Sequence, residues 1–259
     1  MTVKELYENL CGIIPPSLSC EWDRDGLECC PEPGKEVKKI IIALDVTGEV
    51  IDTAVSEGAD VIISHHPIFF GGLKNVSALT YDGAKAVRLI RENIATMSFH
   101  TRLDALSGGV NDILAAEIGL KNVEVVGDEG ICRIGELDDA TNAKAFAKTV
   151  KSALSSGDGV REAHVVLCSA GREVKRIALV GGSGGSDMKL AAAMGADTYL
   201  TGELKHHERL EAAALNMNLL AAGHFFTENP VCSFIERTVS KICPEAEIKT
   251  VFSNTVVEF

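Results

Sequence analysis

The feature that most constrains the fold is an internal repeat. Sliding the 259-residue sequence against itself by 137 positions aligns two apolar segments and places Gly58-Ala59-Asp60 over Gly195-Ala196-Asp197 without a gap. Each copy has the order of an apolar strand, a helix, Gly-Ala-Asp and a second strand, which is typical of a βαβ unit with parallel strands. We therefore predict an α/β fold that has been duplicated.

Polar motifs follow the strands of both copies. Ser64-His65-His66-Pro67 comes directly after the apolar run at 61–63. A shift of 124 positions aligns the segment from His100 to Asp104 with the segment from His224 to Glu228, and both contain a histidine, three further residues and a carboxylate. Because ligands of α/β sheets bind at the carboxyl ends of the strands, we expect these motifs to form a functional site.

Histidine usage indicates a metal site. Six of the seven histidines lie in strand-end motifs: His65, His66, His100, His206, His207 and His224. The seventh, His164, lies in an apolar run and is predicted to be a core residue. Imidazole and carboxylate ligands without a nearby thiolate suit Zn, Mn, Fe(II), Co or Ni. Two bridged metal ions would lower the pKa of a water between them and so supply a nucleophile for hydrolysis.

Three features each leave two interpretations open. The glycine-rich loop from Gly181 to Ser186 is either a phosphate cradle or a tight strand-to-helix turn. Arg102 and Lys205 either hold anionic oxygens of a substrate or balance charge at the rim of an acidic site. Trp22, the only tryptophan, is interpreted as a packing anchor in preference to a ligand contact.

The mixed-charge, glycine-containing connection at 121–131 is the best candidate for a domain boundary. We predict an N-terminal α/β half at 1–127 and a C-terminal α/β half at 128–259. The last strand and the ligands within 224–259 are expected to be able to pack back on the first half.

Composition limits the partners and the compartment. The net charge of −12 and the pI near 5.1 oppose binding to nucleic-acid backbones and to anionic membranes. The eight cysteines include no CxxC pair, and we find neither a signal peptide nor an apolar run long enough to span a membrane. These features predict a cytoplasmic protein whose thiols mostly serve as small core residues.

The motifs together resemble the GTP cyclohydrolase I type 2 homologue family, also called NIF-three-like. The resemblance covers nearly the whole chain and rests on these segments: Glu21-Trp22-Asp23-x-x-Gly26-Leu27, Ala43-Leu44-Asp45-Val46-Thr47, Ser64-His65-His66-Pro67, His100-Thr101-x-Leu103-Asp104 with Gly108-Gly109-Val110-Asn111-Asp112, Gly202-Glu203-Leu204-Lys205-x-His207, and Gly223-His224-x3-Glu228. Arg102, Glu203 and His206 depart from the residues that are usual in this pattern.

The resemblance implies a duplicated three-layer α/β/α fold with a metal cleft between its two halves. It also implies a ring-shaped homohexamer built as a trimer of dimers. Two divalent metal ions per chain would be held by the family's ligand positions, which are His65, His66, Asp104, His224 and Glu228 here. Two further motif histidines, His100 and His207, are predicted to shuttle protons as catalytic residues.

We therefore expect a dinuclear metal-dependent hydrolase that acts on a nucleotide-like substrate, with GTP as the first candidate. The alternative is a metal-binding, metal-delivery or scaffold protein without turnover. A set of groups that orients a substrate would favour the enzyme, and Arg102 and Lys205 are the candidates for it.

Overall fold

The first predicted βαβ unit lies within a five-stranded sheet. The computed structural model describes residues 1–155 and 162–254. In sequence order, the strands of this sheet are β1 (Gly26–Cys29), β2 (Lys39–Ala43), β3 (Val61–Ser64), β4 (Ala95–Ser98) and β11 (Glu247–Val251). Their spatial order is β1-β4-β3-β2-β11, in which β1 is antiparallel to β4 and the other pairs are parallel.

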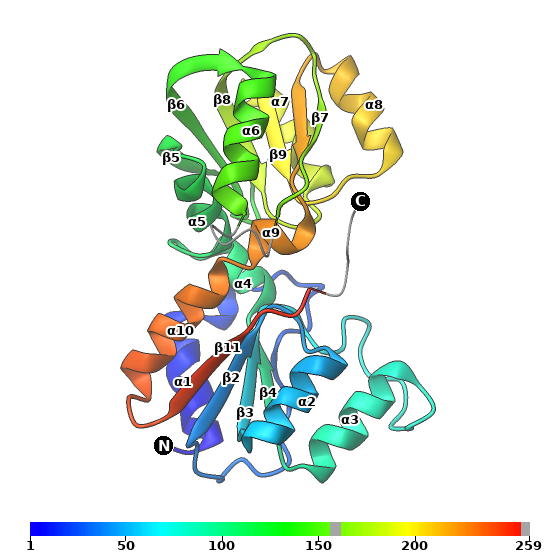
Figure 1. Cartoon of the computed structure of the whole chain (residues 1–259), viewed down its shortest axis with the longest axis vertical. Helices are drawn as coiled ribbons and strands as arrows, with labels where there is room; N and C mark the ends of the chain where they lie inside the picture. Colours follow the sequence, from blue (N-terminus) through cyan, green and yellow to red (C-terminus); the bar gives the residue numbers. More distant parts are fainter. Residues whose placement is uncertain (156–161, 255–259) are drawn as a thin grey trace. The chain divides into compact units, whose positions relative to one another are not determined.

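Helices cover both faces of this sheet. They are α1 (Val3–Ile13), α2 (Gly48–Glu57), α3 (Tyr81–Arg91) and α10 (Val231–Ile242), with a short 3-10 turn at Pro16–Leu18. Helices α1 and α10 pack together on one face, and α2 and α3 lie on the other (Figure 1). Thr47 caps α2, since its hydroxyl accepts the N–H of Val50 at 3.2 Å.

The second copy forms a six-stranded sheet. Its strands are β5 (Lys121–Val126), β6 (Cys132–Asn142), β7 (Val166–Cys168), β8 (Glu173–Val180), β9 (Thr198–Thr201) and β10 (Asn218–Ala221), in the spatial order β5-β6-β8-β9-β10-β7. Its helices are α5 (Val110–Glu117), α6 (Ala143–Leu154), α7 (Met188–Ala193), α8 (His206–Ala214) and α9 (His224–Glu228), with a 3-10 turn at Gly185–Asp187. Strands β8, β9 and β10 are parallel, and β7 is antiparallel to β10.

The two copies match in hydrogen bonding as well as in order. The carboxylate of Asp60 accepts the N–H groups of Lys38 and Lys39 at the start of β2. The carboxylate of Asp197, 137 positions later, accepts the N–H groups of Lys175 and Arg176 in β8. The aspartate of each Gly-Ala-Asp motif therefore ties two parallel strands together at their amino ends. The duplicated α/β fold is confirmed.

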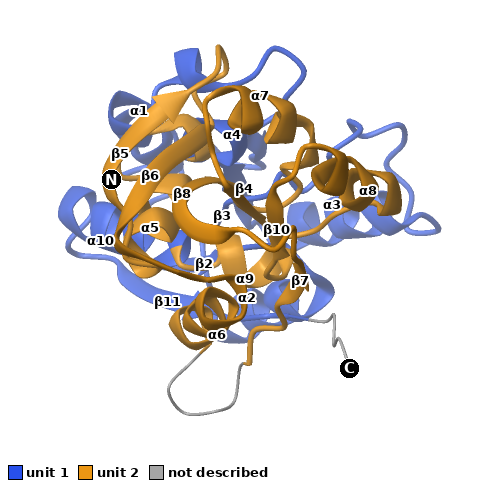
Figure 2. Cartoon of the chain, turned by 90° about the horizontal axis from the view of Figure 1, so that it is seen from above, with its two compact units in different colours: residues 1–103, 231–257 blue, residues 104–230, 258–259 orange. Residues whose placement is uncertain are grey.

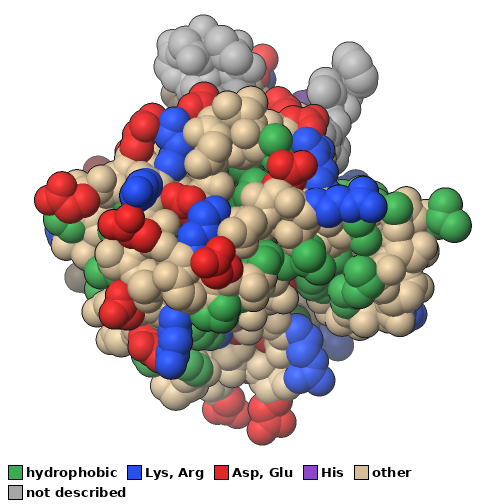
Figure 3. Space-filling view, turned by 90° about the horizontal axis from the view of Figure 1, so that it is seen from below, with side chains coloured by type: hydrophobic (Ala, Val, Ile, Leu, Met, Phe, Trp, Pro, Cys, Tyr) green, Lys and Arg blue, Asp and Glu red, His purple; other side chains and the backbone are tan. Residues whose placement is uncertain are grey.

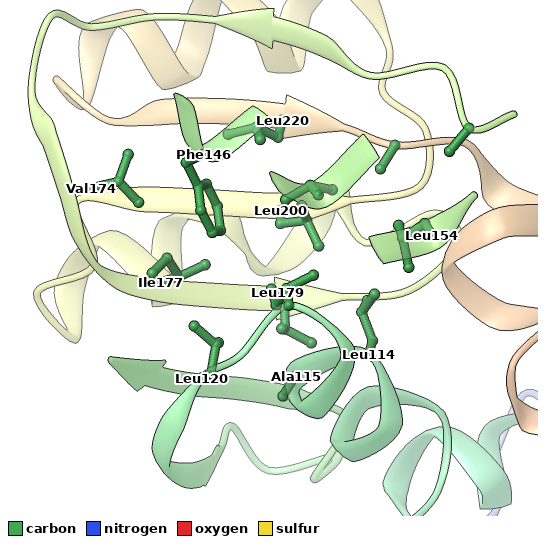
Figure 4. Close-up of a cluster of buried hydrophobic side chains, with 14 of the residues drawn as sticks. Leu114, Ala115, Leu120, Phe146, Leu154, Val174, Ile177, Leu179, Leu200 and Leu220 are labelled. Carbon is green, nitrogen blue, oxygen red and sulfur yellow. The ribbon is translucent and has the colours of Figure 1, made fainter. Parts of the chain in front are cut away.

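In the core of the second copy, the side chains of one strand, β8, pack against helices on both faces of the sheet. Side chains alternate across a strand, so Ile177 and Leu179 face Phe146 of α6, whereas Ala178 and Val180 belong to the cluster under α7 and α8. Figure 4 shows the first of these clusters, with Leu200 and Leu220 beside Phe146 and residues of α5 below them. Each unit is thus a sheet between two layers of helices.

The chain divides into two compact units (Figure 2), one made of Met1–Leu103 with the segment from Val231, the other of Asp104–Pro230. The division differs from the predicted boundary at 127/128. Residues 104–127 join the second unit because α5 and β5 pack on its sheet. The chain returns to the first unit at Val231, and its last strand, β11, pairs with β2 and completes the first sheet.

Two predictions about single residues have clear outcomes. His164 is not a core residue, because it is exposed and precedes β7, which begins only at Val166. The prediction of thiols in the core holds for four of the eight cysteines, Cys29, Cys132, Cys232 and Cys243. Burial raises the pKa of the Cys29 thiol to about 11 and that of the Cys132 thiol to about 12. Within the described ranges, no helix is both long enough and apolar enough to span a membrane.

Candidate metal centre

Three histidines converge in the first unit. His65 and His66 follow β3 directly and are buried, and His100 begins the short helix α4 (His100–Ala105) just after the parallel neighbour β4. One ring nitrogen from each lies within 4.8 Å of one nitrogen from each of the others. The two motifs were predicted to meet because their strands end at the same edge of the sheet, and the structure confirms this for these three side chains.

Carboxylates orient two of the three rings. Asp45 Oδ1 lies 2.8 Å from Nδ1 of His66, and Asp23 Oδ2 lies 3.0 Å from Nδ1 of His100. Because a carboxylate accepts the hydrogen bond, Nδ1 is the donor in both pairs, which makes Nε2 the ring nitrogen that would bind a metal ion. Burial alone would raise the pKa of Asp23, but hydrogen bonds from His100 and Thr101 outweigh it and lower the pKa.

Arg102 has a structural role. Its Nε donates to both carboxylate oxygens of Asp25 at 3.0 and 2.9 Å, and the side chain is only 3% exposed. Asp25 also accepts the backbone N–H of His100 at 3.1 Å. Arg102 therefore balances the charge of Asp25, although it does so in a buried pair and not at the rim of the site as the second interpretation expected. The departure from the family pattern at this position is matched by a buried ion pair.

The second unit carries its own histidine and carboxylates. Asp104, near the end of α4, and Glu228, at the end of α9, are both buried. His224 and Glu228 are four residues apart on α9, with Nε2 and Oε2 separated by 2.9 Å. The His-x3-acid motifs at 100–104 and 224–228 thus both lie on one-turn helices, where residues i and i+4 share a face.

The missing histidine pair of the second copy has a steric reason. Gly202 stands at the position of His65, and a Cβ there would lie 2.6 Å from the carbonyl oxygen of Gly182 and 2.8 Å from Cα of His224. Glu203, at the position of His66, lies 3.3 Å from Nδ1 of His224. A side chain larger than hydrogen at 202 would force α9 away from the loop after β8.

The glycine-rich loop after β8 is a tight turn. The N–H groups of Gly181, Gly182 and Gly184 donate to side-chain oxygens of Asn111, Thr227 and Thr201, respectively. These three groups are therefore unavailable to a phosphate, and that interpretation is not supported. A Cβ on Gly182 would overlap the carboxylate of Glu228, so the glycine allows the loop to pass close to the candidate ligands.

Several supporting residues were missed by the sequence interpretation. Arg133 is completely buried in β6, where it pairs with Asp112 and donates to the carbonyl oxygens of Ala105 and Leu106 at the end of α4. It thereby fixes the helix that carries Asp104. The only available signal was a single arginine in an apolar run. Asp23 could have been suspected from the charged residues around Trp22. Asp45 could have been suspected because it is a carboxylate just after a strand.

Other predicted residues lie at the surface. Lys205, His206 and His207 are exposed at the start of α8. The role of His207 as a proton shuttle therefore stays a prediction, as does a substrate contact by Lys205. Trp22 is 60% exposed, so its interpretation as a packing anchor is wrong.

Comparison with known proteins identifies the family. Residues 1–257 match the family described as Duf34/NIF3 (NGG1p interacting factor 3). The chain belongs to this family. Among curated Duf34/NIF3 relatives, the GTP cyclohydrolase 1 type 2 homolog of Streptomyces coelicolor is 32% identical over 240 residues, covering 89% of this chain and 82% of the relative. The Protein NIF3 homolog of Schizosaccharomyces pombe is 31% identical over 234 residues, covering 84% and 81%.

Solved structures agree with the Duf34/NIF3 fold. Protein SA1388 of Staphylococcus aureus superimposes with a TM-score of 0.87 at 26% identity, covering 98% of this chain and 97% of that chain. Reduced HcgD from Methanocaldococcus jannaschii gives a TM-score of 0.81 at 29% identity, covering 96% and 97%.

The donor groups fit a divalent metal ion. His65, His66 and His100 offer three nitrogens, two from carboxylate-oriented rings, in a buried setting that lacks a competing thiolate among the clustered residues. His224 and Glu228 bring an imidazole nitrogen and a carboxylate oxygen toward one point. Such imidazole and carboxylate sets suit Zn and the first-row transition metals.

Proposed function

We propose that this Duf34/NIF3 member is a metal-dependent hydrolase with a dinuclear centre held by His65, His66, Asp104, His224 and Glu228. The observation that carries the proposal is the buried convergence of His65, His66 and His100 at the ends of parallel strands, with two of the rings oriented by carboxylates. Ligands oriented in this way are pre-organised, which favours tight metal binding. The matching His-x3-acid pair on α9 supports a contribution from the second unit.

In the proposed hydrolysis, the metal ions and the protein side chains have different roles. When bound, divalent ions polarise a substrate oxygen and lower the pKa of a water, so that hydrolysis can occur near neutral pH. Asp45 and Asp23 hold the rings of His66 and His100 and fix their tautomers. His100, the less buried of the three clustered histidines, would move a proton between the site and solvent, and His207 is the second candidate.

The substrate class follows from the relatives' names. Because relatives such as that of Streptomyces coelicolor are named GTP cyclohydrolase 1 type 2 homolog, a nucleotide such as GTP is the first compound to test. The alternative is a metal-binding or metal-delivery protein without turnover. One observation favours that alternative: Arg102, a candidate for orienting an anionic substrate, is engaged in a buried ion pair with Asp25.

The deciding experiment measures metal content and GTP turnover on the same protein. We expect about two metal ions per chain by elemental analysis after reconstitution. Glu228→Gln should lower the metal content and reduce turnover by at least about a hundredfold, because it removes a charged ligand. His164→Asn, at an exposed histidine outside the site, is the matched control and should change neither. Full metal occupancy without turnover would support the delivery alternative, and no metal at all would refute both.

A further inference from the structure

Two large aromatic side chains beside the histidine cluster face solvent. Trp22 lies in the loop before β1, and Phe70 lies four residues after His66; each is 60% exposed. Aromatic side chains normally bury 150–250 Å² each, so leaving two of them exposed forgoes favourable burial. Exposed aromatic rings that lie close together are typical of a binding surface.

Both rings touch the same histidine. The centroid of Trp22 lies 6.0 Å from that of His100 at an interplanar angle of 76°, and the centroid of Phe70 lies 5.5 Å away at 87°. Phe70 also lies 5.6 Å from His66. Such an edge contact covers at most one face of each ring. The 60% exposure shows that much of the remaining ring surface is open to a ligand.

We propose that Trp22 and Phe70 form a binding site for a flat aromatic heterocycle of nucleobase size. A base stacks on an aromatic side chain whatever its hydrogen-bonding edge, because every base has a π-face. A ring stacked on either side chain lies next to His100 and hence beside the candidate metal ligands. The net charge of −12 opposes a nucleic-acid strand, so the ligand is a small molecule.

This inference deepens the proposed function. It restricts the hydrolase's substrates to compounds that carry a planar aromatic ring, and it assigns specificity to Trp22 and Phe70. The inference rests on the proposed function only for the reaction that follows binding.

The test uses the fluorescence of Trp22, the only tryptophan in the chain. The purified full-length protein is titrated with GMP and, separately, with ribose 5-phosphate, and the emission is corrected for absorption by the ligand. We expect GMP to change the emission saturably and ribose 5-phosphate, which lacks the ring, to leave it unchanged. Equal responses to both compounds, or no saturable response to GMP, would overturn the proposal.

Variants assign the effect to the rings. Phe70→Leu keeps Trp22 as the reporter and should weaken GMP binding about fivefold to a hundredfold, the equivalent of one lost base–aromatic stack. Phe70→Tyr should retain the affinity. Tyr81→Leu, which removes another exposed ring (73%), is the matched control and should also bind GMP normally. Thermal unfolding checks that all three variants fold, as expected for surface substitutions.

The outcomes separate this inference from the proposed function. GMP binding that follows the predicted variant pattern in a protein without turnover would support the aromatic site and refute the hydrolase. Turnover of GTP with an unchanged KM in Phe70→Leu, together with unchanged GMP affinity, would support the hydrolase and refute the aromatic site.

Discussion

At the scale of single residues, Glu28 shows how the loop carrying the histidine pair is held. Its carboxylate accepts the N–H groups of Ile68 and Phe69 at 3.1 and 3.4 Å, immediately after His65-His66-Pro67. Burial raises the pKa of this carboxyl to about 7 and outweighs the hydrogen bonds that would lower it. A support of the site is therefore protonated in mildly acidic solution and charged in mildly basic solution.

The pKa of Glu28 predicts a pH-dependent stability. The folded carboxyl keeps its proton up to about pH 7, whereas the ordinary pKa of a glutamate carboxyl is 4.5. Folding therefore takes up a proton between these values, and the free energy of unfolding should fall as pH rises through this window. The expected loss is on the order of 1–3 kcal/mol. Urea unfolding of the metal-free protein at pH 5 and pH 8 measures it.

Glu28→Gln isolates this effect. The amide keeps an acceptor for the two N–H groups but does not titrate, so the difference in stability between pH 5 and pH 8 should shrink. Glu117→Gln, at an exposed position on α5, is the control and should behave like the unmodified chain. A pH dependence that persists unchanged in Glu28→Gln would contradict the assignment.

At the scale of helices and strands, the matching aspartates carry the clearest prediction. Asp60 and Asp197 each accept two backbone N–H groups of the preceding parallel strand. Replacing either with alanine leaves these donors without their acceptor and should lower the free energy of unfolding by about 2–4 kcal/mol.

Chemical denaturation of the two alanine variants checks this prediction. Asp60→Asn and Asp197→Asn should each recover part of the loss, since an amide oxygen still accepts a hydrogen bond. Asp139→Ala, at an exposed aspartate, should leave the stability within about 0.5 kcal/mol of the starting value. Losses of that small size at 60 and 197 would show that the shared contacts are dispensable.

The strands that were predicted correctly from the sequence are those with a strong local pattern of apolar residues. The parallel strands β2, β3, β8 and β9 are β-branched or apolar runs, and the repeat placed them in order. Strand β1, with Gly26 and Cys29, and β5, with five exposed residues, lack an apolar pattern and were missed. Both are antiparallel edge strands, where pairing with a neighbouring strand matters more than local propensity; β1 pairs with the distant β4, and β5 pairs with the adjacent β6.

For the site, the sequence did not predict contacts between residues that lie far apart along the chain. Histidines at strand ends were visible as motifs, and their convergence followed from the parallel sheet. Asp23 and Asp25 contact His100 and Arg102 across more than seventy residues of sequence, and no local pattern indicates such pairing. The exposure of His164 and Trp22 likewise depended on tertiary packing, which overrides the preference of each residue type.

At the scale of the whole molecule, we propose assembly into a ring-shaped homohexamer, a trimer of dimers. Large hydrophobic side chains that are exposed in the single chain support self-association: Leu79, Tyr81, Ile90, Val125 and Leu210. In the view of Figure 3, basic and acidic side chains are interspersed and hydrophobic ones gather toward one side. Such patches favour protein contacts.

Light scattering coupled to size-exclusion chromatography tests the assembly. The expected mass is six times the chain mass of 27.5 kDa, and it should not change on dilution through the micromolar range. A mass of one or two chains at every concentration would contradict the hexamer. Leu79→Ser replaces a 96% exposed leucine with a polar residue and should weaken assembly.

The position of β11 at the end of the sequence also determines which unit is completed first during synthesis. The sheet that carries His65 and His66 needs β11 as the partner of β2, yet all of Asp104–Pro230 precedes β11 in the sequence. During synthesis, the second unit is therefore complete while the first still lacks its final strand. Until then the outer edge of β2 offers unpaired backbone groups, which other chains can use to aggregate. The synthesis of the first unit therefore starts before that of the second unit and ends after it.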